Sequence, residues 1–318
     1  MADHTHIEWT DATWNPITGC SIVSPGCTNC YAMRLAGTRL KHLPSRASLT
    51  IDSKAGPVWN GQVRFNDQWL DQPLRWKRPR RIFVCAHGDL FAENVPDEWI
   101  DKVFAVMALA PQHTFQVLTK RAARMRKYLT DRDARQRWRQ DAVEVAGWNM
   151  VMAGIVAKTQ VTPWPLTNVW LGVSAEDQVR ADERIPDLLA TPAAIRFVSA
   201  EPLLGPIELW KYLRALCDRC PPWETPCRIG CEHCTKLDWI IVGGESGKGA
   251  RPMHPDWVRS IRDQCSSAGT AFFFKQWGAW APYDHQNIGR APGVLWHGNA
   301  AIDINGEKVA SERWAEHG

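Results

Sequence analysis

The sequence predicts an α/β fold, specifically a TIM-like full or partial (β/α) barrel, and two observations support this. From residue 81 onward, short apolar runs alternate with segments whose apolar residues recur at helical spacing. The apolar runs are nearly continuous, as in parallel strands buried on both faces. The expected strands are Ile82–Ala86, Thr114–Leu118, Val169–Val173, Ile195–Ser199, Trp239–Val242 and Ala271–Phe274, and the expected helices are Asp97–Ala110, Ala122–Leu129, Glu176–Ala190 and Pro255–Ala268. A doubly wound sheet is the alternative fold.

The first 80 residues and the C-terminal tail extend this pattern. Thr13 to Ile17 is expected to form a first strand, which brings the total to about seven, the range of a full or partial barrel. Residues 33–48 predict an amphipathic helix that ends before Pro44, and residues 50–72 a hairpin-like excursion. We therefore expect a barrel over residues 1–280, with a Cys-rich insert at 217–234, and an extension over 281–318 that holds a small hairpin.

Composition bounds the class of protein. The chain has 318 residues, is 45% hydrophobic and carries a net charge of +4, so it is long enough for a substantial core and permits a polyanionic partner. It has neither an apolar leader segment nor a long uncharged apolar run, so we expect a cytoplasmic protein that does not enter a membrane. Its ten cysteines, several in Cys-x2-Cys pairs, then point to metal rather than to disulfides.

Three cysteines lie in a Gly- and Pro-containing loop close to the N-terminus. Cys20, Cys27 and Cys30 form a Cys-x6-Cys-x2-Cys arrangement that lets three thiolates converge. A structural zinc site normally has four protein ligands, whereas an iron–sulfur cube held by three cysteines keeps one iron open. No fourth Cys or His follows within a few residues, so the cube is favoured, although His4, His6 or His42 could complete a zinc site.

A second set of cysteines lies in a Pro-rich insert. Two Cys-x2-Cys pairs separated by ten residues are typical of a structural zinc site, and the alternative is an auxiliary iron–sulfur cluster. One further cysteine, or His233, is then spare. The set consists of Cys217, Cys220, Cys227, Cys231 and Cys234. Cys85 and Cys265, by contrast, have the surroundings of core thiols.

Polar residues and glycines follow the expected strands, so in a barrel they gather at the carboxyl-terminal rim beside the first cysteine loop. Each alone fits a helix cap or a tight turn equally well, but as a set at one rim they favour ligand binding. Acidic members would accept from amino or hydroxyl groups, and Lys275 and the Thr119-Lys120-Arg121 segment would hold an anion. The set is Asp89, Thr119, Lys120, Ser174, Glu176, Glu201, Gly243, Gly244, Glu245, Ser246 and Lys275.

These motifs together resemble a known family. The run from Ile7 to Pro16 leads into Gly-Cys-x6-Cys-x2-Cys-Tyr-Ala, and Cys-Ala-His-Gly-Asp-Leu-Phe (85–91), Leu-Thr-Lys-Arg (118–121), Val-Ser-Ala-Glu-Pro-Leu (198–203), Gly-Gly-Glu-Ser-Gly (243–247) and Phe-Lys-Gln-Trp-Gly (274–278) follow. This pattern resembles the phage-associated family of uncharacterised three-Cys-motif proteins, themselves similar to radical S-adenosylmethionine enzymes. The resemblance covers most of the chain.

The resemblance implies a 4Fe-4S cluster on Cys20, Cys27 and Cys30, S-adenosylmethionine bound at the open iron and at the rim residues, and an electron-donor protein as partner. The spacing departs from the Cys-x3-Cys-x2-Cys common in radical enzymes, and the aromatic residue, Tyr31, follows the last cysteine instead of preceding it. Cluster binding is therefore an expectation that the three thiols support, whereas cleavage of S-adenosylmethionine is expected from the resemblance alone.

Two basic runs make nucleic acid a candidate partner and substrate. One run surrounds Trp76 and the other begins at Lys120, and basic residues interleaved with aromatic ones can follow phosphates and stack on bases. Most such runs are solvated helix faces. The alternative to an enzyme is a non-catalytic nucleic-acid- or protein-binding module in which both cysteine sets hold structural metal.

Overall fold

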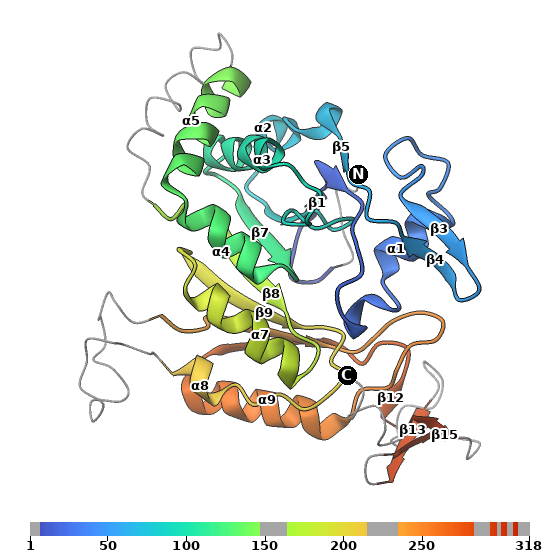
Figure 1. Ribbon diagram of the computed structural model, residues 1–318. Helices are drawn as coiled ribbons and strands as arrows, with labels where there is room; N and C mark the ends of the chain where they lie inside the picture. Colours follow the sequence, from blue (N-terminus) through green and yellow to red (C-terminus); the bar gives the residue numbers. More distant parts are fainter. Residues whose placement is uncertain are drawn as a thin grey trace. The chain divides into compact units, whose positions relative to one another are not determined.

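Among the residues that the structure describes, seven strands form one sheet in the order β1-β6-β7-β8-β9-β10-β11. Figure 1 shows the chain coloured along its sequence. The computed structural model describes residues 7–146, 164–214, 235–282, 293–297, 300–303 and 308–310. The chain divides into two units, the first comprising Met1–Val23, Ala32–Gly172 and Ala190–Ile195, and the second Ser24–Tyr31, Val173–Leu189 and Arg196–Gly318.

The strands of the main sheet are β1 (Ala12–Trp14), β6 (Arg81–Val84), β7 (Thr114–Thr119), β8 (Val169–Ser174), β9 (Ile195–Ala200), β10 (Trp239–Gly243) and β11 (Ala271–Gln276). The helices are α1 (Tyr31–Gly37), α2 (Gln72–Arg75), α3 (Asp97–Leu109), α4 (Ala122–Thr130), α5 (Arg132–Ala146), α7 (Gln178–Leu189), α8 (Trp210–Leu213) and α9 (Pro255–Ala268). Short 3-10 helices cover Pro25–Cys27 and Asp67–Trp69.

The strand order agrees with the predicted α/β class. The pairs β1–β6, β6–β7, β9–β10 and β10–β11 are parallel, and the strands follow one another in chain order. A doubly wound sheet reverses its strand order at a switch point, so this order is that of a barrel. Within the described ranges the order ends at β1 and β11, which makes the fold a partial (β/α) barrel.

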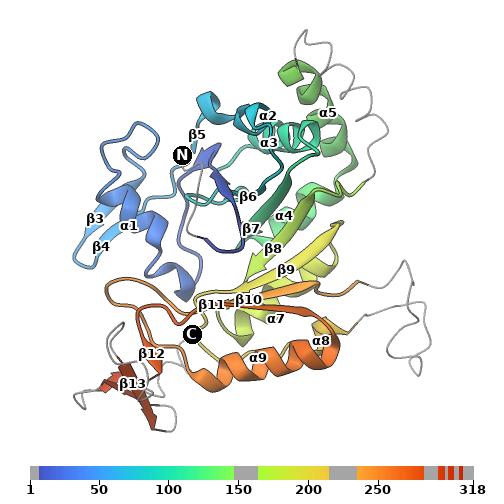
Figure 2. The same cartoon turned by 180° about the vertical axis from the view of Figure 1, so that it is seen from behind.

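In the first unit, α3 supplies the core that packs on the strands. Pro96 precedes its first residue and Asp97 and Glu98 occupy its first turn, where negative charge is favourable. Ile100, Phe104 and Met107 are at most 2% exposed. Each such burial contributes about 1.5–3 kcal/mol. Helix α5 lies beside α3 (Figure 2) and completes this core through Ala142, which clusters with Ala105 and Leu109.

Two N-terminal predictions were too long. The strand expected over Thr13–Ile17 ends at Trp14, because Pro16 has no N–H for a ladder, and β2 (Ile17–Thr18) instead pairs with β5 (Arg64–Phe65). The helix expected over 33–48 ends at Gly37, and turns follow. A Cβ on Gly37 would lie 2.1 Å from Cβ of Pro57, so the chain turns away where it meets the neighbouring hairpin.

That hairpin confirms the excursion predicted within residues 50–72. Strands β3 (Thr50–Ser53) and β4 (Gly56–Trp59) are antiparallel and pair from Thr50 with Trp59 to Ser53 with Gly56. The remainder of the excursion is β5, the 3-10 helix and the start of α2.

In the second unit, capping residues set the helix ends. Asp177 accepts the N–H of Arg180 at 2.8 Å, so α7 begins at Gln178 and not at Glu176 as predicted. The predicted bounds of α9 are confirmed. His254 accepts the N–H of Asp256, Pro255 occupies the first turn, and Gly269 at φ +65° closes the helix.

The C-terminal tail holds more than the single hairpin expected there. Strands β12 (Ala281–Pro282), β13 (Gly293–His297), β14 (Ala300–Asp303) and β15 (Lys308–Ala310) form a four-stranded sheet in that order. β13–β14 and β14–β15 are antiparallel, whereas β12–β13 is parallel. Of the helices that lie within the described residues, none is long and apolar enough to cross a membrane.

Candidate functional site

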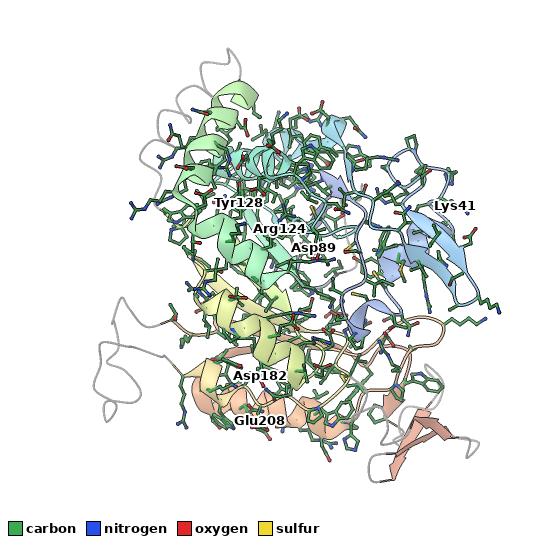
Figure 3. All side chains as sticks on the ribbon, viewed as in Figure 1. Lys41, Asp89, Arg124, Tyr128, Asp182 and Glu208 are labelled. Carbon is green, nitrogen blue, oxygen red and sulfur yellow. The ribbon has the colours of Figure 1, made fainter. Side chains whose placement is uncertain are left out.

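In the first unit, Asp89, which is labelled in Figure 3, contacts two other predicted rim positions. Its carboxylate is buried at the carboxyl end of β7 and accepts the Thr119 hydroxyl at 2.7 Å and the backbone N–H of Lys120 at 3.1 Å. It also accepts the N–H of Phe91 at 2.9 Å, and Arg121 Nη1 lies 3.2 Å from it. Asp89 therefore joins the segment after β6 to the segment after β7.

Arg121 extends this network to the first cysteine. Its guanidinium donates to the Cys20 sulfur at 3.4 Å, to the Ser21 carbonyl at 3.0 Å and to both carboxylate oxygens of Glu93 at 3.1 and 3.2 Å. Burial lowers the pKa of Arg121, but the negative charges of Asp89, Cys20 and Glu93 outweigh burial and raise the pKa above its usual value. The side chain is therefore a fixed cation beside the Cys20 sulfur.

Glycines hold the backbone before Cys20 against the loop after β6. Gly19 has φ +94° and donates its N–H to the His87 carbonyl at 3.1 Å. A Cβ at Gly19 would lie 2.2 Å from the Gln62 carbonyl oxygen, and one at Gly88 would lie 3.0 Å from that of Gly19. A side chain at either glycine would collide with the neighbouring backbone. The close contacts of Gly19 with Gln62 and with the loop after β6 therefore fix the backbone just before Cys20.

In the second unit, Glu176 holds the loop that carries Cys27. Its Oε1 accepts the N–H of Gly26 at 3.2 Å, and its Oε2 pairs with Arg184 Nη1 at 3.0 Å. The two side chains are 0% and 2% exposed. A Cβ on Gly26 would lie 2.9 Å from the Glu176 carboxyl carbon. A buried, charge-compensated carboxylate thus anchors the loop next to Cys27.

Glu245 anchors the same loop further along. Asn29 donates to Glu245 Oε2 at 2.9 Å, while Arg251 makes a bidentate pair with the carboxylate at 2.6 and 2.8 Å. Arg251 also donates to the Pro25 carbonyl at 2.9 Å. The prediction that Glu245 binds a ligand ammonium thus concerns a carboxylate that is already neutralised by an arginine.

Glu201 and Lys275 form the more accessible ion pair of the predicted set. Lys275 Nζ lies 2.6 Å from Glu201 Oε1, and the side chains are 22% and 20% exposed. Trp277 lies close by along the chain and packs edge-on against Phe274 at 4.9 Å. Because these two charges reach solvent, they can exchange their partner for a ligand more readily than Glu176 and Glu245 can.

The two strand-end glycines pack against protein. A Cβ on Gly244 would lie 1.9 Å from the Trp277 carbonyl oxygen, and the Gly244 N–H donates to Gln276 at 2.9 Å. A Cβ on Gly243 would lie 3.1 Å from the Glu201 carboxyl carbon. These contacts explain both glycines as close packing of β10 on its neighbours.

The two predicted serines have different surroundings. The Ser174 carbonyl accepts a hydrogen bond from Arg184 Nη1 at 2.9 Å, and the exposed Ser246 hydroxyl accepts one from Gln276 at 2.9 Å.

Four residues that hold these networks together were not predicted from the sequence: Arg184, Arg251, Asn29 and Glu93. Arg251 lies in a loop without periodicity, so no pattern indicates its role. Arg184 lies on the apolar stripe of α7, and an arginine at such a position was a usable signal.

The cysteines of the N-terminal loop form no disulfide among the described residues. Cys27 is buried, and its sulfur lies 3.9 Å from the Ser24 hydroxyl, while Cys20 and Cys30 are partly exposed. Cys20 belongs to the first unit, and Cys27 and Cys30 to the second. Among the described residues, no three His, Cys, Asp or Glu side chains gather closely enough to hold a metal ion. Thiols are the donor type that iron–sulfur clusters take, and the Arg121 guanidinium contacts one of these three sulfurs.

The other cysteines divide into two groups. Cys85 and Cys265 are buried, which confirms the prediction of core thiols, and burial raises the pKa of both thiols to about 12. The second set, Cys217 to Cys234, lies outside the described residues, so its metal stays a prediction.

Internal contacts take up much of the two basic runs. Arg121 is buried, and Arg124 binds the carbonyls of Ala92 and Val95 and pairs with Asp97 (Figure 3). Around the buried Trp76, Arg75 pairs with Asp71, Arg81 pairs with Asp11, and Arg80 lies 4.7 Å over the indole ring. These side chains stabilise the first unit, which weakens their use as evidence for nucleic acid.

Comparison with known proteins identifies a family. Residues 4–306 match the family described as "Protein of unknown function (DUF5131)". No curated protein and no solved structure matches the chain.

Proposed function

The chain belongs to the DUF5131 family, and we propose that it is a radical S-adenosylmethionine-like iron–sulfur enzyme. In this proposal Cys20, Cys27 and Cys30 bind a 4Fe-4S cluster and leave one iron open. The proposal is based on the resemblance of the cysteine motif to radical enzymes and on the phage association of the three-Cys-motif family that the chain resembles.

One observation carries the proposal: both segments that bear the cysteines are fixed by buried charged side chains at the carboxyl ends of strands. Arg121 holds Cys20 and Ser21 in the first unit. Glu176 and Glu245, each paired with an arginine, hold the loop of Cys27 and Cys30 in the second. Outer-shell partners orient metal ligands and hold them in place, and these buried ion pairs could do so for the two cysteine-bearing segments.

The predicted rim residues have two different roles in this proposal. Glu176 and Glu245 are already compensated by Arg184 and Arg251, so they support the loop. Glu201 and Lys275 keep partial exposure, so they are the groups proposed to meet the hydroxyl and carboxylate groups of S-adenosylmethionine. When bound, a cluster of this kind supplies one electron that splits the sulfonium into methionine and a carbon radical.

The electron must come from a donor protein, and the substrate is the open part of the proposal. A nucleic acid or modified nucleotide remains the first candidate, on the strength of the resemblance and of those basic residues whose side chains are exposed. The reaction class would be hydrogen abstraction or base modification.

The test is product formation from the cofactor. Protein purified without oxygen and reconstituted with iron and sulfide is reduced chemically and supplied with S-adenosylmethionine, and methionine and 5′-deoxyadenosine are measured. We expect both products from the wild-type chain and neither from Cys27→Ala. A reduced wild-type cluster that yields neither product would refute the radical mechanism while leaving a cluster protein.

Lys275→Met provides a second arm. Loss of its ammonium should raise the S-adenosylmethionine concentration needed for half-maximal product, by roughly tenfold for one charge-assisted contact. Lys211→Met is the matched control, because Lys211 pairs with Asp182 on the surface of the same unit. Equal effects of the two substitutions would remove Lys275 from the cofactor site.

A chain that binds zinc alone would instead be a metal-stabilised binding module, the second function considered from the sequence. Both cysteine sets would then be structural, and no cofactor cleavage would be seen.

A further inference from the structure

Arg121 directs its donors at the segment that carries the first cysteine. Nη1 donates to the Cys20 sulfur at 3.4 Å, and Nη2 donates to the Ser21 carbonyl at 3.0 Å and to the Ser21 hydroxyl at 2.6 Å. Nε and Nη2 also bind Glu93, and Nη1 also binds Asp89. All three guanidinium nitrogens are therefore engaged.

The guanidinium is held before any ligand arrives. The Arg121 side chain is 6% exposed, and that of Asp89, its buried partner, is 7% exposed. The Arg121 N–H donates to the Thr119 hydroxyl oxygen at 2.9 Å, and that hydroxyl donates to Asp89 at 2.7 Å. This closed set of hydrogen bonds places Arg121 at the end of β7 without help from Cys20.

The charges around Cys20 make the arginine necessary. Asp89 and Glu93 contribute two negative charges against the single positive charge of Arg121. A Cys20 thiolate would add a third negative charge, and Arg121 is a cation that contacts all three groups. The sulfur and the two acids can be tolerated together because the guanidinium lies among them.

We propose that Arg121 is the positioning residue of the Cys20 ligand and that its charge raises the reduction potential of the cluster. The inference rests on the proposed cluster and goes beyond it by giving a role to a residue that binds no iron. The planar fork orients the sulfur and Ser21, while the positive charge favours the reduced cluster, which carries one more negative charge.

Two substitutions separate orientation from charge. Arg121→Lys keeps the cation but loses the fork, whereas Arg121→Gln loses the cation. We expect both to release iron to a chelator faster, as expected for a loss of about 10–100-fold in metal affinity when an outer-shell partner is removed. Only Arg121→Gln should lower the midpoint potential clearly, measured by an optical redox titration.

Glu93→Gln gives the opposite sign and avoids the buried core. Its side chain is 55% exposed, so the fold should survive the change. Removing its negative charge should raise the midpoint potential, and a residue with a purely structural role would not produce opposite shifts from these two substitutions. If Arg121→Gln fails to fold, as judged by circular dichroism, Glu93→Gln and Arg121→Lys still decide the matter.

Arg124→Gln is the control, since Arg124 binds the Ala92 and Val95 carbonyls and Asp97, with no bond to Cys20 in the described contacts. It should keep the wild-type iron-release rate and potential. Wild-type protein that binds no iron would overturn the proposed function itself. Wild-type protein that binds iron, with Arg121→Gln and Glu93→Gln matching it in both measurements, would overturn the role of Arg121 alone.

Discussion

Glu176 Oε2 and Arg184 Nη1 form an ion pair 3.0 Å apart in which neither side chain is more than 2% exposed. The same carboxylate accepts the Gly26 N–H, one residue before Cys27. A buried pair of this kind is costly to form and costlier to break, because removing one partner leaves the other charge uncompensated. The loop of the second and third cysteines is therefore tied to the stability of its unit.

Glu176→Gln should destabilise the protein strongly. The amide keeps the shape of the side chain but leaves Arg184 as a buried, unpaired cation, for which we expect a loss of about 3–5 kcal/mol. The midpoint of urea unfolding measures the effect. Glu183→Gln is the matched control, because Glu183 pairs with Arg180 at the exposed surface of the same helix and should cost less than about 1 kcal/mol. Equal midpoints for the two variants would contradict the anchoring role.

Gly244→Ala tests whether the strand-end glycines serve packing. A Cβ at this position would lie 1.9 Å from the Trp277 carbonyl oxygen, so β10 or β11 must shift, at a cost of about 1–3 kcal/mol. Gly205→Ala is the control, since its nearest atom, Cβ of Asp177, would lie at an ordinary 3.6 Å. Thermal unfolding without added ligand should separate the variants. A Gly244→Ala protein as stable as Gly205→Ala would return this glycine to the ligand interpretation.

His87 predicts a pH dependence of stability. Burial first, and the positive charge of Arg46 second, lower its pKa from 6.5 to about 4. As pH falls below 6.5 the unfolded chain binds a proton that the folded chain resists, so stability is lost between pH 6.5 and 4. The loss from this group should be about 2 kcal/mol between pH 7 and pH 5.

Urea midpoints at those two pH values check the assignment. His87→Gln cannot bind the proton, so the variant should lose less stability than the wild-type chain on going from pH 7 to pH 5. An identical loss in both proteins would show that His87 titrates normally when folded.

Cys27→Ala should remove iron and leave zinc. The second cysteine set is distant in sequence and supplies its own ligands, so the two metals are expected to bind independently. Metal analysis of the variant checks this, with Cys265→Ala as a control because Cys265 is a buried core thiol. Loss of both metals together from Cys27→Ala would point to one shared site or to general unfolding.

Local chemistry accounts for the parts of the fold that the sequence predicts well. Pro255 and Gly269 bound α9 because proline fits the first turn and glycine accepts the left-handed end. Apolar runs such as Thr114–Leu118 are parallel strands because two buried faces leave no polar alternation. These features depend on residues that are close in sequence, so they can be predicted from the sequence.

The features that were not predicted are of two kinds, one with a local signal and one that depends on distant partners. Helix α5 is highly charged and does not stand out by hydrophobicity, yet Ala134, Trp138 and Ala142 recur at four-residue spacing and are at most 2% exposed. That stripe was a usable signal. By contrast, the helix expected over 33–48 stops where Gly37 meets Pro57, and the bond from Arg121 to Cys20 spans 101 residues. No local sequence pattern predicts either of these two contacts.

The candidate site divides in the same way. The cysteines and the acidic residues after the strands follow from motif and position, and the sequence therefore names Asp89, Glu201 and Glu245. Which of these carboxylates stays available to a ligand depends on the arginine partners. Arg251 neutralises Glu245, whereas Glu201 pairs with the partly exposed Lys275. This distinction is made only by the folded chain.

Metal content decides whether the first cysteine loop binds an iron–sulfur cluster. Iron, sulfide and zinc are measured, with an absorbance spectrum, on full-length protein purified and reconstituted without oxygen. We expect about four irons with matching sulfide, and about one zinc from the second cysteine set, per chain. Zinc without iron after careful reconstitution would contradict this expectation and leave a metal-stabilised binding protein on a partial (β/α) barrel.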